Sequence, residues 1–197
     1  MSTKNLTLIV IAALVLLLGG CGCNGYNGLV KLDETVKNAW ANVESDYQRR
    51  SDLIPNLVNT VKGEANFEQT TLQNVISARA SATQVKLDAN DLSPEKIQQY
   101  QAAQGQLTQA LGKLLMVTEN YPNLRANDAF RGLQAQLEGT ENRINKARSD
   151  YNGAVKSFNS HIRGFFNSMF LNKEIFAKRE AFKATAGSEL APTVNFD

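Results

Sequence analysis

Cysteine and histidine are almost missing from this chain of 197 residues, which carries two cysteines and one histidine. Both cysteines, Cys21 and Cys23, lie near the N-terminus, so a disulfide framework cannot stabilise the rest of the chain. A Cys-Xaa-Cys pair without a second Cys or His pair does not complete a zinc site. We therefore expect no metal and no cofactor. We interpret Cys23 as a residue without a role of its own, and the alternative is that its thiol carries an acyl chain.

Catalytic motifs are also lacking. His161 is the only histidine that could serve as a base, and the chain contains neither a Gly-Xaa-Ser-Xaa-Gly elbow nor a glycine-rich phosphate loop. His161 falls on an apolar helical stripe, where a packed position at the end of a bundle is the simpler interpretation. The sequence predicts that the protein is not an enzyme.

Charge of one sign is not in excess either. The 21 basic and 19 acidic residues give a net charge of +2, and no block of like charges stands out. Nucleic-acid-binding chains carry concentrated basic patches, so we expect no nucleic-acid partner.

Proline and glycine, the residues that interrupt helices, are scarce at 4 and 13. Apolar residues instead recur at alternating steps of three and four, the period of a helix. The stripe is clearest in the last long segment, where it runs through Phe130, Leu133, Leu137, Thr140, Ile144, Ala147, Tyr151, Ala154, Phe158 and His161. Long helices with short links pack as antiparallel bundles. The predicted fold is an all-α, antiparallel up-and-down bundle of long helices behind an N-terminal signal or anchor segment.

Local signals predict where these helices begin and end. Pro55 is expected to kink or break the first helix near 52–55, because proline removes a backbone donor. Residues 86–93 are expected to form a loop, with Ser93 capping a helix that starts at Pro94. Asn127 or Asp128 is expected to cap the last long helix.

The first 25 residues carry a targeting signal. Residues 6–18 form an apolar run in which Thr7 is the one polar residue, followed by Leu18-Gly19-Gly20-Cys21. A polar start, a short apolar region and small residues before a cysteine are typical of a lipoprotein signal peptide. A run of 13 residues is too short to span a bilayer core, which takes about 20 apolar residues. We expect Cys21 to be the lipidated N-terminus on the exported face of a bacterial membrane, with a retained single-pass anchor as the alternative.

The expected domain organisation has four parts. Residues 1–20 form the lipoprotein signal peptide or membrane anchor, 21–28 a tether, and 29–163 the helical bundle. Residues 164–197 form a phenylalanine-rich short helix and an extended tail. The apolar cluster at Phe165, Phe166, Met169, Phe170 and Leu171 either closes one end of the bundle or contacts lipid or a partner.

Charged residues interrupt the apolar stripes at a few places, and these are the candidate site. The possible interaction surface consists of Arg49, Arg50, Asp52, Glu141, Arg148 and Asn152. The last three are spaced at i, i+7 and i+11, on one helix face. Three interpretations remain open: a solvated face with weak ion pairs, a polar layer that fixes bundle register, and a binding surface for an anionic or peptide ligand. Five aromatics, Trp40, Tyr47, Tyr100, Tyr121 and Tyr151, are expected to be core residues.

Several separated motifs resemble the LemA family of bacterial membrane proteins. They are Tyr26-Asn27-Gly28-Leu29-Val30, Ala39-Trp40, RRSDLIPNLV from Arg49 to Val58, NTVKG to Gly63, ENYPNLRAN from Glu119 to Asn127, and LEGTENRINKARSDYN from Leu137 to Asn152. The resemblance covers roughly residues 26–196 and implies an all-helical bundle behind a membrane anchor, with no established enzymatic activity. Two departures from the family pattern are the short apolar run before Cys21 and Phe165-Phe166 after Ile162-Arg163, which leaves the last helix free to continue past Arg163.

These observations predict a membrane-tethered, non-enzymatic helical interaction or scaffold protein of the bacterial cell envelope. The alternative is an envelope binding protein that captures a small or peptide ligand through a groove lined by Arg and Glu. The expected partners are the membrane, through a lipid on Cys21 or the 6–18 segment, and a protein of unknown identity.

Overall fold

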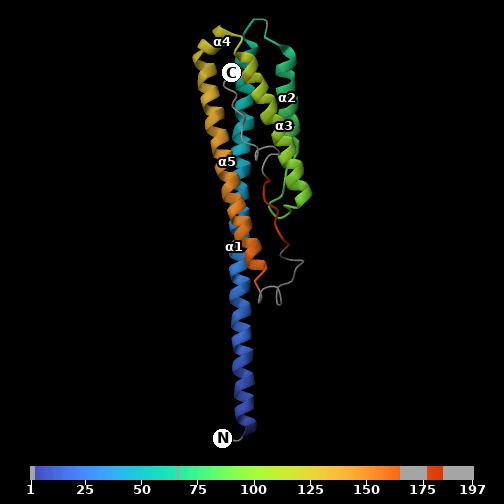
Figure 1. Ribbon diagram of the computed structural model, residues 1–197, viewed down its shortest axis with the longest axis vertical. Coiled ribbons are helices and arrows are strands. Elements are labelled where there is room, and N and C mark those ends of the chain that lie inside the picture. Colours follow the sequence, from blue (N-terminus) through green and yellow to red (C-terminus); the bar gives the residue numbers. More distant parts are fainter. Residues whose placement is uncertain (1–2, 66, 165–176, 184–197) are drawn as a thin grey trace, which may run out of the picture.

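The computed structural model describes residues 3–65, 67–164 and 177–183. Its helices are α1 (Thr3–Lys62), α2 (Gln69–Gln84), α3 (Pro94–Thr118), α4 (Pro122–Ala126) and α5 (Asp128–Ile162). Figure 1 shows α1, α2, α3 and α5 running alternately up and down, with the short α4 at the end remote from the N-terminus. The predicted all-α antiparallel bundle is confirmed.

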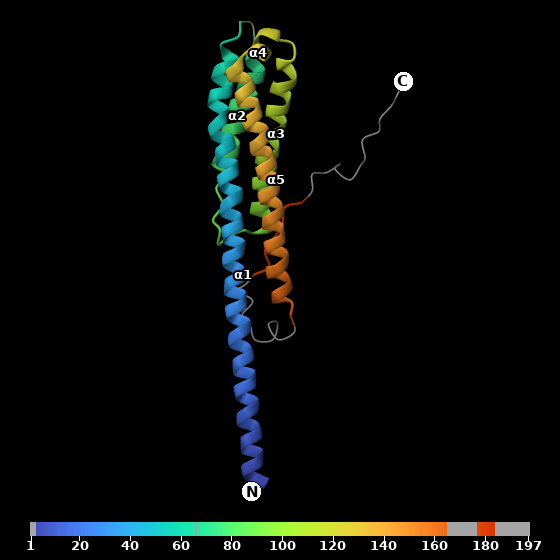
Figure 2. The same cartoon turned by 90° about the vertical axis from the view of Figure 1, so that its left-hand side faces the viewer.

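Helix α1 is by far the longest element. Its 60 residues correspond to about 90 Å at 1.5 Å per residue. It packs chiefly along α5, and α2 packs chiefly along α3. Figures 1 and 2 show that the N-terminal part of α1 projects beyond the other helices. The helix runs without a break through the 20/21 and 28/29 positions expected as boundaries, so the predicted tether is helical.

Of the kink or break predicted near 52–55, the break is wrong, because α1 continues through Pro55 to Lys62. Proline has no N–H, so it leaves the carbonyl of the residue four positions earlier, Ser51, without its helical partner. The Nε–H of Arg79 in α2 donates to that carbonyl oxygen at 2.9 Å. A side chain from a neighbouring helix thus satisfies the group that the proline leaves unpaired.

Most other predicted boundaries are confirmed. A loop separates α2 from α3, and Ser93 and Pro94 stand at the cap and first position of α3. Asn127 caps α5, with its side-chain oxygen accepting from the N–H groups of Ala129 and Phe130. Helix α5 does not continue past Arg163: it ends at Ile162, and the N–H of Gly164 bonds to the carbonyl of His161 at 3.1 Å. Glycine is the residue that most often follows a helix end.

The core consists of two apolar clusters stacked along the bundle. One gathers around Trp40, Tyr100 and Tyr151, and the other around Leu57, Leu114 and Phe130, all with almost no exposed surface. The expected core positions are therefore confirmed for four aromatics, Trp40, Tyr47, Tyr100 and Tyr151, and the stripe residues Leu137 and Ile144 are also buried. Tyr121 is only partly buried and packs against the second cluster.

The N-terminal region of α1 differs from the bundle in its exposure. Ile11 and Leu16 have 55% and 76% of their surface exposed. Among the residues that the structure describes, no helix combines the length and the apolar character that crossing a membrane requires. Of the phenylalanine-rich tail, residues 165–176 and 184–197 lie outside the described part, so the expected short helix there is not addressed. Residues 177–183 are described and are not helical.

Candidate functional site

A buried arginine separates the two core clusters. Arg50 is 2% exposed and lies between Tyr47 of the first cluster and Ile54 of the second. Its guanidinium donates to Glu141 Oε2 at 3.1 Å and to Thr108 Oγ1 at 2.9 Å. It also bonds to the side-chain and backbone oxygens of Gln104, at 2.6 and 3.3 Å.

These contacts join α1, α3 and α5 at one level of the bundle. Arginine suits the position because its planar fork can reach several acceptors at once while keeping its charge. A buried cation is costly unless its donors are used. Here both terminal nitrogens of Arg50 have partners, and only its Nε lacks one. Among the interpretations of the charged residues, a polar layer within the bundle therefore describes Arg50 and Glu141.

Arg49 and Asp52 belong to a different surface. Both are exposed on α1, and Asp52 accepts a bond from Gln48 of the same helix at 2.7 Å. The six predicted residues thus do not form one site. Arg50 and Glu141 meet in the polar layer, Arg49 and Asp52 face outward, and Arg148 and Asn152 lie about two and three turns further along α5.

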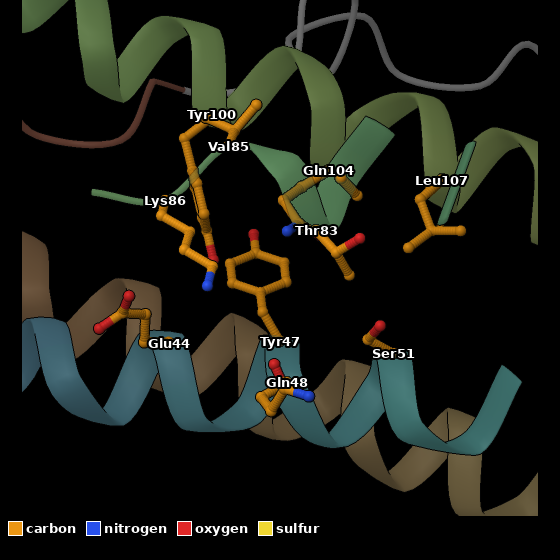
Figure 3. A pocket seen from close by; sticks show the side chains of 11 residues that line it. Glu44, Tyr47, Gln48, Ser51, Thr83, Val85, Lys86, Tyr100, Gln104 and Leu107 are labelled. Atoms are coloured by element: carbon orange, nitrogen blue, oxygen red, sulfur yellow. The ribbon is translucent and has the colours of Figure 1, made fainter. Parts of the chain in front are cut away.

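Two hollows adjoin the polar layer. One, of about 280 Å³, lies between α1, α2 and α3. Figure 3 shows that Tyr47 from α1 and Tyr100 from α3 point toward one another there. Burial raises the pKa of both phenols, against the opposing effect of nearby arginines. The other hollow, of about 340 Å³, lies between α3 and α5 and combines Leu111, Leu115 and Leu137 with Arg50, Glu138 and Glu141.

The second feature of the site is a chain segment that belongs to no helix. Residues 177–183 lie against α1, α3 and α5 and run opposite to α5, since Arg179 contacts Asn159 while Phe182 contacts Asn152. Figure 1 shows this segment in red beside the α1–α5 pair. We call the surface that holds it the segment groove, formed by Asp33, Trp40, Gln101, Arg148, Tyr151, Asn152 and Asn159.

Three primary amides bind the backbone of the segment in the same way. Asn159 donates to the carbonyl of Arg179 at 2.8 Å and accepts from its N–H at 3.0 Å. Asn152 pairs in the same reciprocal manner with Phe182, at 3.1 and 2.8 Å. Gln101 does so with Lys183, at 2.8 and 3.4 Å. Each amide offers one donor and one acceptor, as a neighbouring strand would.

The spacing of the two asparagines suits an extended peptide. Asn152 and Asn159 are seven residues apart on α5, a rise of about 10.5 Å. Their partners, Phe182 and Arg179, are three residues apart, which is about 10 Å of extended chain. The hydroxyl of Tyr151 donates to the carbonyl of Glu180 between them, at 3.0 Å. The two asparagines therefore hold the segment at points three residues apart, and Tyr151 binds the carbonyl that lies between those points.

Two side chains of the segment are also bound. Phe182 is 6% exposed; its ring stacks on Trp40 at 6.0 Å and meets Tyr151 edge-on at 5.4 Å. The guanidinium of Arg148 lies 4.8 Å from the centre of the same ring. Arg179 pairs with Asp33 at 3.0 Å and donates to the carbonyl of Asn90 at 3.2 Å.

Protonation equilibria reflect this packing. Burial would raise the pKa of Asp33, but the hydrogen bonds from Lys37 and Arg179 outweigh it and hold the pKa below its ordinary value. Burial raises the pKa of Tyr151 to about 12. At neutral pH the groove therefore presents a carboxylate to Arg179 and a protonated phenol to the backbone.

Of the residues that hold the segment, Arg148 and Asn152 were predicted as surface candidates, whereas Asn159, Gln101 and Asp33 were missed. A signal for Asn159 was present: it repeats Asn152 at i, i+7 on a helix whose neighbouring positions, Tyr151 and Phe158, are apolar. Within the described part of the chain, no group of three or more His, Cys, Asp or Glu side chains could hold a metal ion. His161 lies at the bundle end, with Nε2 3.3 Å from the carbonyl of Gly25.

Comparisons with known proteins converge on one family. The LemA family matches residues 39–196. Two magnetosome proteins of Paramagnetospirillum magneticum, MamQ 1 and MamQ 2, are each 26% identical over 156 residues, which is 70% of this chain and 57% of theirs. Protein LemA of Metamycoplasma hominis is 24% identical over 147 residues, 75% of this chain and 64% of its own. The chain thus spans less than two thirds of each of these relatives.

Proposed function

Because this chain belongs to the LemA family, we propose that it is a membrane-tethered, non-enzymatic helical interaction protein of the bacterial cell envelope. The observation that carries the proposal is the continuity of α1. One helix leads from Thr3 into the bundle core. The element that projects from the bundle is therefore the same helix that contributes to its core. Before cleavage, the exposed apolar side chains of Ile11 and Leu16 favour burial of the projecting end in lipid.

The proposal includes the form of the anchor. Leu18-Gly19-Gly20-Cys21 supports cleavage before Cys21 and lipidation of its thiol. Cleavage there would leave residues 21–28 as helix between the lipid and the first core residue, Leu29. A span of eight helical residues rises about 12 Å, which would hold the bundle close to the membrane surface.

Mass spectrometry of the intact, membrane-extracted protein tests this anchor. The expected result is an N-terminus at Cys21 with the added mass of acyl chains. Cys21→Ser should abolish the modification, and the matched variant Cys23→Ser should keep it. A protein that begins at Met1 with an unmodified Cys21 would exclude lipidation and leave the retained single-pass anchor.

A non-enzymatic role is supported by what the charged residues do. Arg50 binds Glu141 and the polar side chains of α3, and Arg148 and Asn152 bind the segment. Arginine stays protonated and cannot act as a general base. The outward charges Arg49 and Asp52 are left as the candidates for contact with a protein partner.

Crosslinking in membranes followed by affinity capture tests for that partner. The full chain should recover a reproducible protein, and Arg49→Glu combined with Asp52→Lys should lose it. Arg50 is left intact, since reversing a buried charge would test stability instead. Lys113→Glu, an exposed change on α3, is the control and should retain the partner. If no partner is recovered under several growth conditions, the interaction role is contradicted.

A second candidate function is capture of a small or peptide ligand. The hollow between α3 and α5 favours it, because apolar walls with a few charged groups, here Arg50, Glu138 and Glu141, are typical of ligand pockets. A ligand that binds only the folded state raises the melting temperature. Melting of the protein against ligand pools should give a shift that Glu138→Gln reduces, and the absence of a shift with every pool would contradict this candidate.

A further inference from the structure

Residues 177–183 are held as a separate peptide would be held. They form no helix with the rest of the chain, and they contact side chains of α1, α3 and α5 and the backbone carbonyl of Asn90. The N–H and C=O groups of Arg179, Phe182 and Lys183 each have a partner on the groove. Backbone bonds of this kind give affinity for any extended chain, and side-chain pockets supply the specificity.

The pockets of the segment groove define which sequence it reads. The first residue needs a cation, because Asp33 lies 3.0 Å from the Arg179 guanidinium and is itself only 13% exposed. The fourth needs an aromatic ring, because Trp40 and Tyr151 surround Phe182. The two residues between are less restricted, since the side chain of Glu180 is partly exposed. The ligand class is an extended peptide of the form Arg-Xaa-Xaa-Phe.

We propose that the segment groove is a peptide-binding site, and that in trans it takes residues 177–183 of a second copy of this chain. Each copy carries both the groove and a sequence that fits it. Twelve residues, 165–176, join the described end of α5 to the segment, and a chain of that length can reach up to about 40 Å. The same contacts form whichever copy supplies the segment, which is the condition for exchange between copies.

The concentration of the protein decides whether the groove holds the segment of its own chain or that of a second copy. A short link gives the segment of the same chain an effective concentration of the order of millimolar. The segment of the same chain therefore fills the groove in dilute solution, and exchange becomes favourable where copies are crowded. This inference does not depend on the membrane anchor of the proposed function, and a detergent-solubilised full chain suffices to test it.

The first test asks whether the groove binds the segment as a free peptide. The full chain with Phe182→Ala keeps the groove but weakens its own segment. Adding a capped synthetic peptide of residues 177–183 should change the emission of Trp40, the only tryptophan, in a saturable way. The same peptide carrying Phe182→Ala or Arg179→Ala should bind at least about 10-fold more weakly. Absence of binding up to millimolar peptide would overturn the proposal.

A second peptide-binding variant controls for misfolding of the Phe182→Ala chain. Arg179→Ala in the full chain leaves Phe182 and the aromatic cluster in place, so it weakens the segment without opening the core. Peptide should displace its segment, with a lower apparent affinity than in the Phe182→Ala chain. Asn152→Leu added to either variant should remove binding, because it deletes one reciprocal amide pair. Binding that survives Asn152→Leu would show that the peptide sits elsewhere and would overturn the assignment.

The second test identifies the source of the segment. One full chain carries Phe182→Ala, with an intact groove. The other carries Asn152→Leu and Trp40→Phe, with an intact segment and no tryptophan. Mixing them should give association by sedimentation and a change in Trp40 emission of the first chain, whereas neither chain alone should associate. Peptide binding without association of the two chains would overturn the second copy as the source.

Discussion

The Nε–H of Arg79 lies 2.9 Å from the carbonyl oxygen of Ser51, the oxygen that Pro55 deprives of its helical donor. This bond connects α2 to the middle of α1. It explains how a 60-residue helix passes an internal proline without ending there.

Removing this donor should destabilise the protein. Arg79→Ala leaves a carbonyl on a buried turn without a partner, at a cost of about 1–3 kcal/mol. In a Pro55→Ala background the substituted residue regains a backbone N–H that can donate to Ser51, so the same change should cost markedly less. Urea unfolding of the four proteins of this double-mutant cycle measures the difference. Equal costs in both backgrounds would contradict the role given to Arg79.

The polar layer should respond unequally to loss of its two charges. Arg50→Ala strands the buried oxygens of Gln104 and should lower the free energy of unfolding by about 3 kcal/mol or more. Glu141→Gln keeps an acceptor on a side chain that is 41% exposed, so it should cost less than about 1 kcal/mol. Denaturant midpoints of both variants provide the comparison. A larger loss from Glu141→Gln would show that the ion pair, not the burial of Arg50, dominates.

Leucines in the same core cluster should differ according to their surroundings. Leu57 is fully buried, and Leu57→Ala is expected to cost about 4 kcal/mol through lost burial and the cavity left behind. Leu137 is 7% exposed and borders the hollow between α3 and α5, so Leu137→Ala should cost nearer about 2 kcal/mol. Thermal or chemical unfolding measures both. An unchanged midpoint for either variant would contradict its place in the core.

Helix capping offers a matched pair of substitutions. The side chain of Asn127 accepts two N–H groups at the start of α5, so Asn127→Ala should cost about 1 kcal/mol. The side chain of Ser93 makes no such bond at the start of α3, and Ser93→Ala should cost clearly less. Equal losses in melting temperature would show that the two caps work alike.

Alkaline pH should destabilise the fold through its buried tyrosines. Burial raises the pKa of Tyr151 to about 12, whereas an exposed phenol titrates near pH 10. The unfolded chain then releases protons that the folded chain keeps, so stability is unaffected below about pH 10 and falls as pH rises from about 10 to 12. Tyr151→Phe should reduce this slope by up to about 1.4 kcal/mol per pH unit. Urea midpoints across pH 8–12 measure the slope, and an unchanged slope would contradict the burial of the phenol.

The sequence was informative wherever the cause of a structure lay nearby in the chain. The apolar period predicted the bundle, and Pro94 and Asn127 marked helix starts, because periodicity and capping act within a few residues. Pro55 led to a wrong prediction because Arg79, which donates to the carbonyl that the proline leaves unpaired, comes from another helix. The segment groove was only partly predicted, through Arg148 and Asn152. Its ligand has no periodic pattern, and its partners Asp33 and Asn159 are over 100 residues apart.

The continuity of α1 has a mechanical consequence. After the proposed cleavage before Cys21, residues 21–62 remain as one continuous helix of about 63 Å, so the tilt of its first turns sets the tilt of the whole bundle. Rotating this helix by about 10° about its N-terminal end would displace the remote end, near α4, by about 11 Å. The orientation of the outward charges Arg49 and Asp52 is thereby fixed by how the first turns of the helix are held.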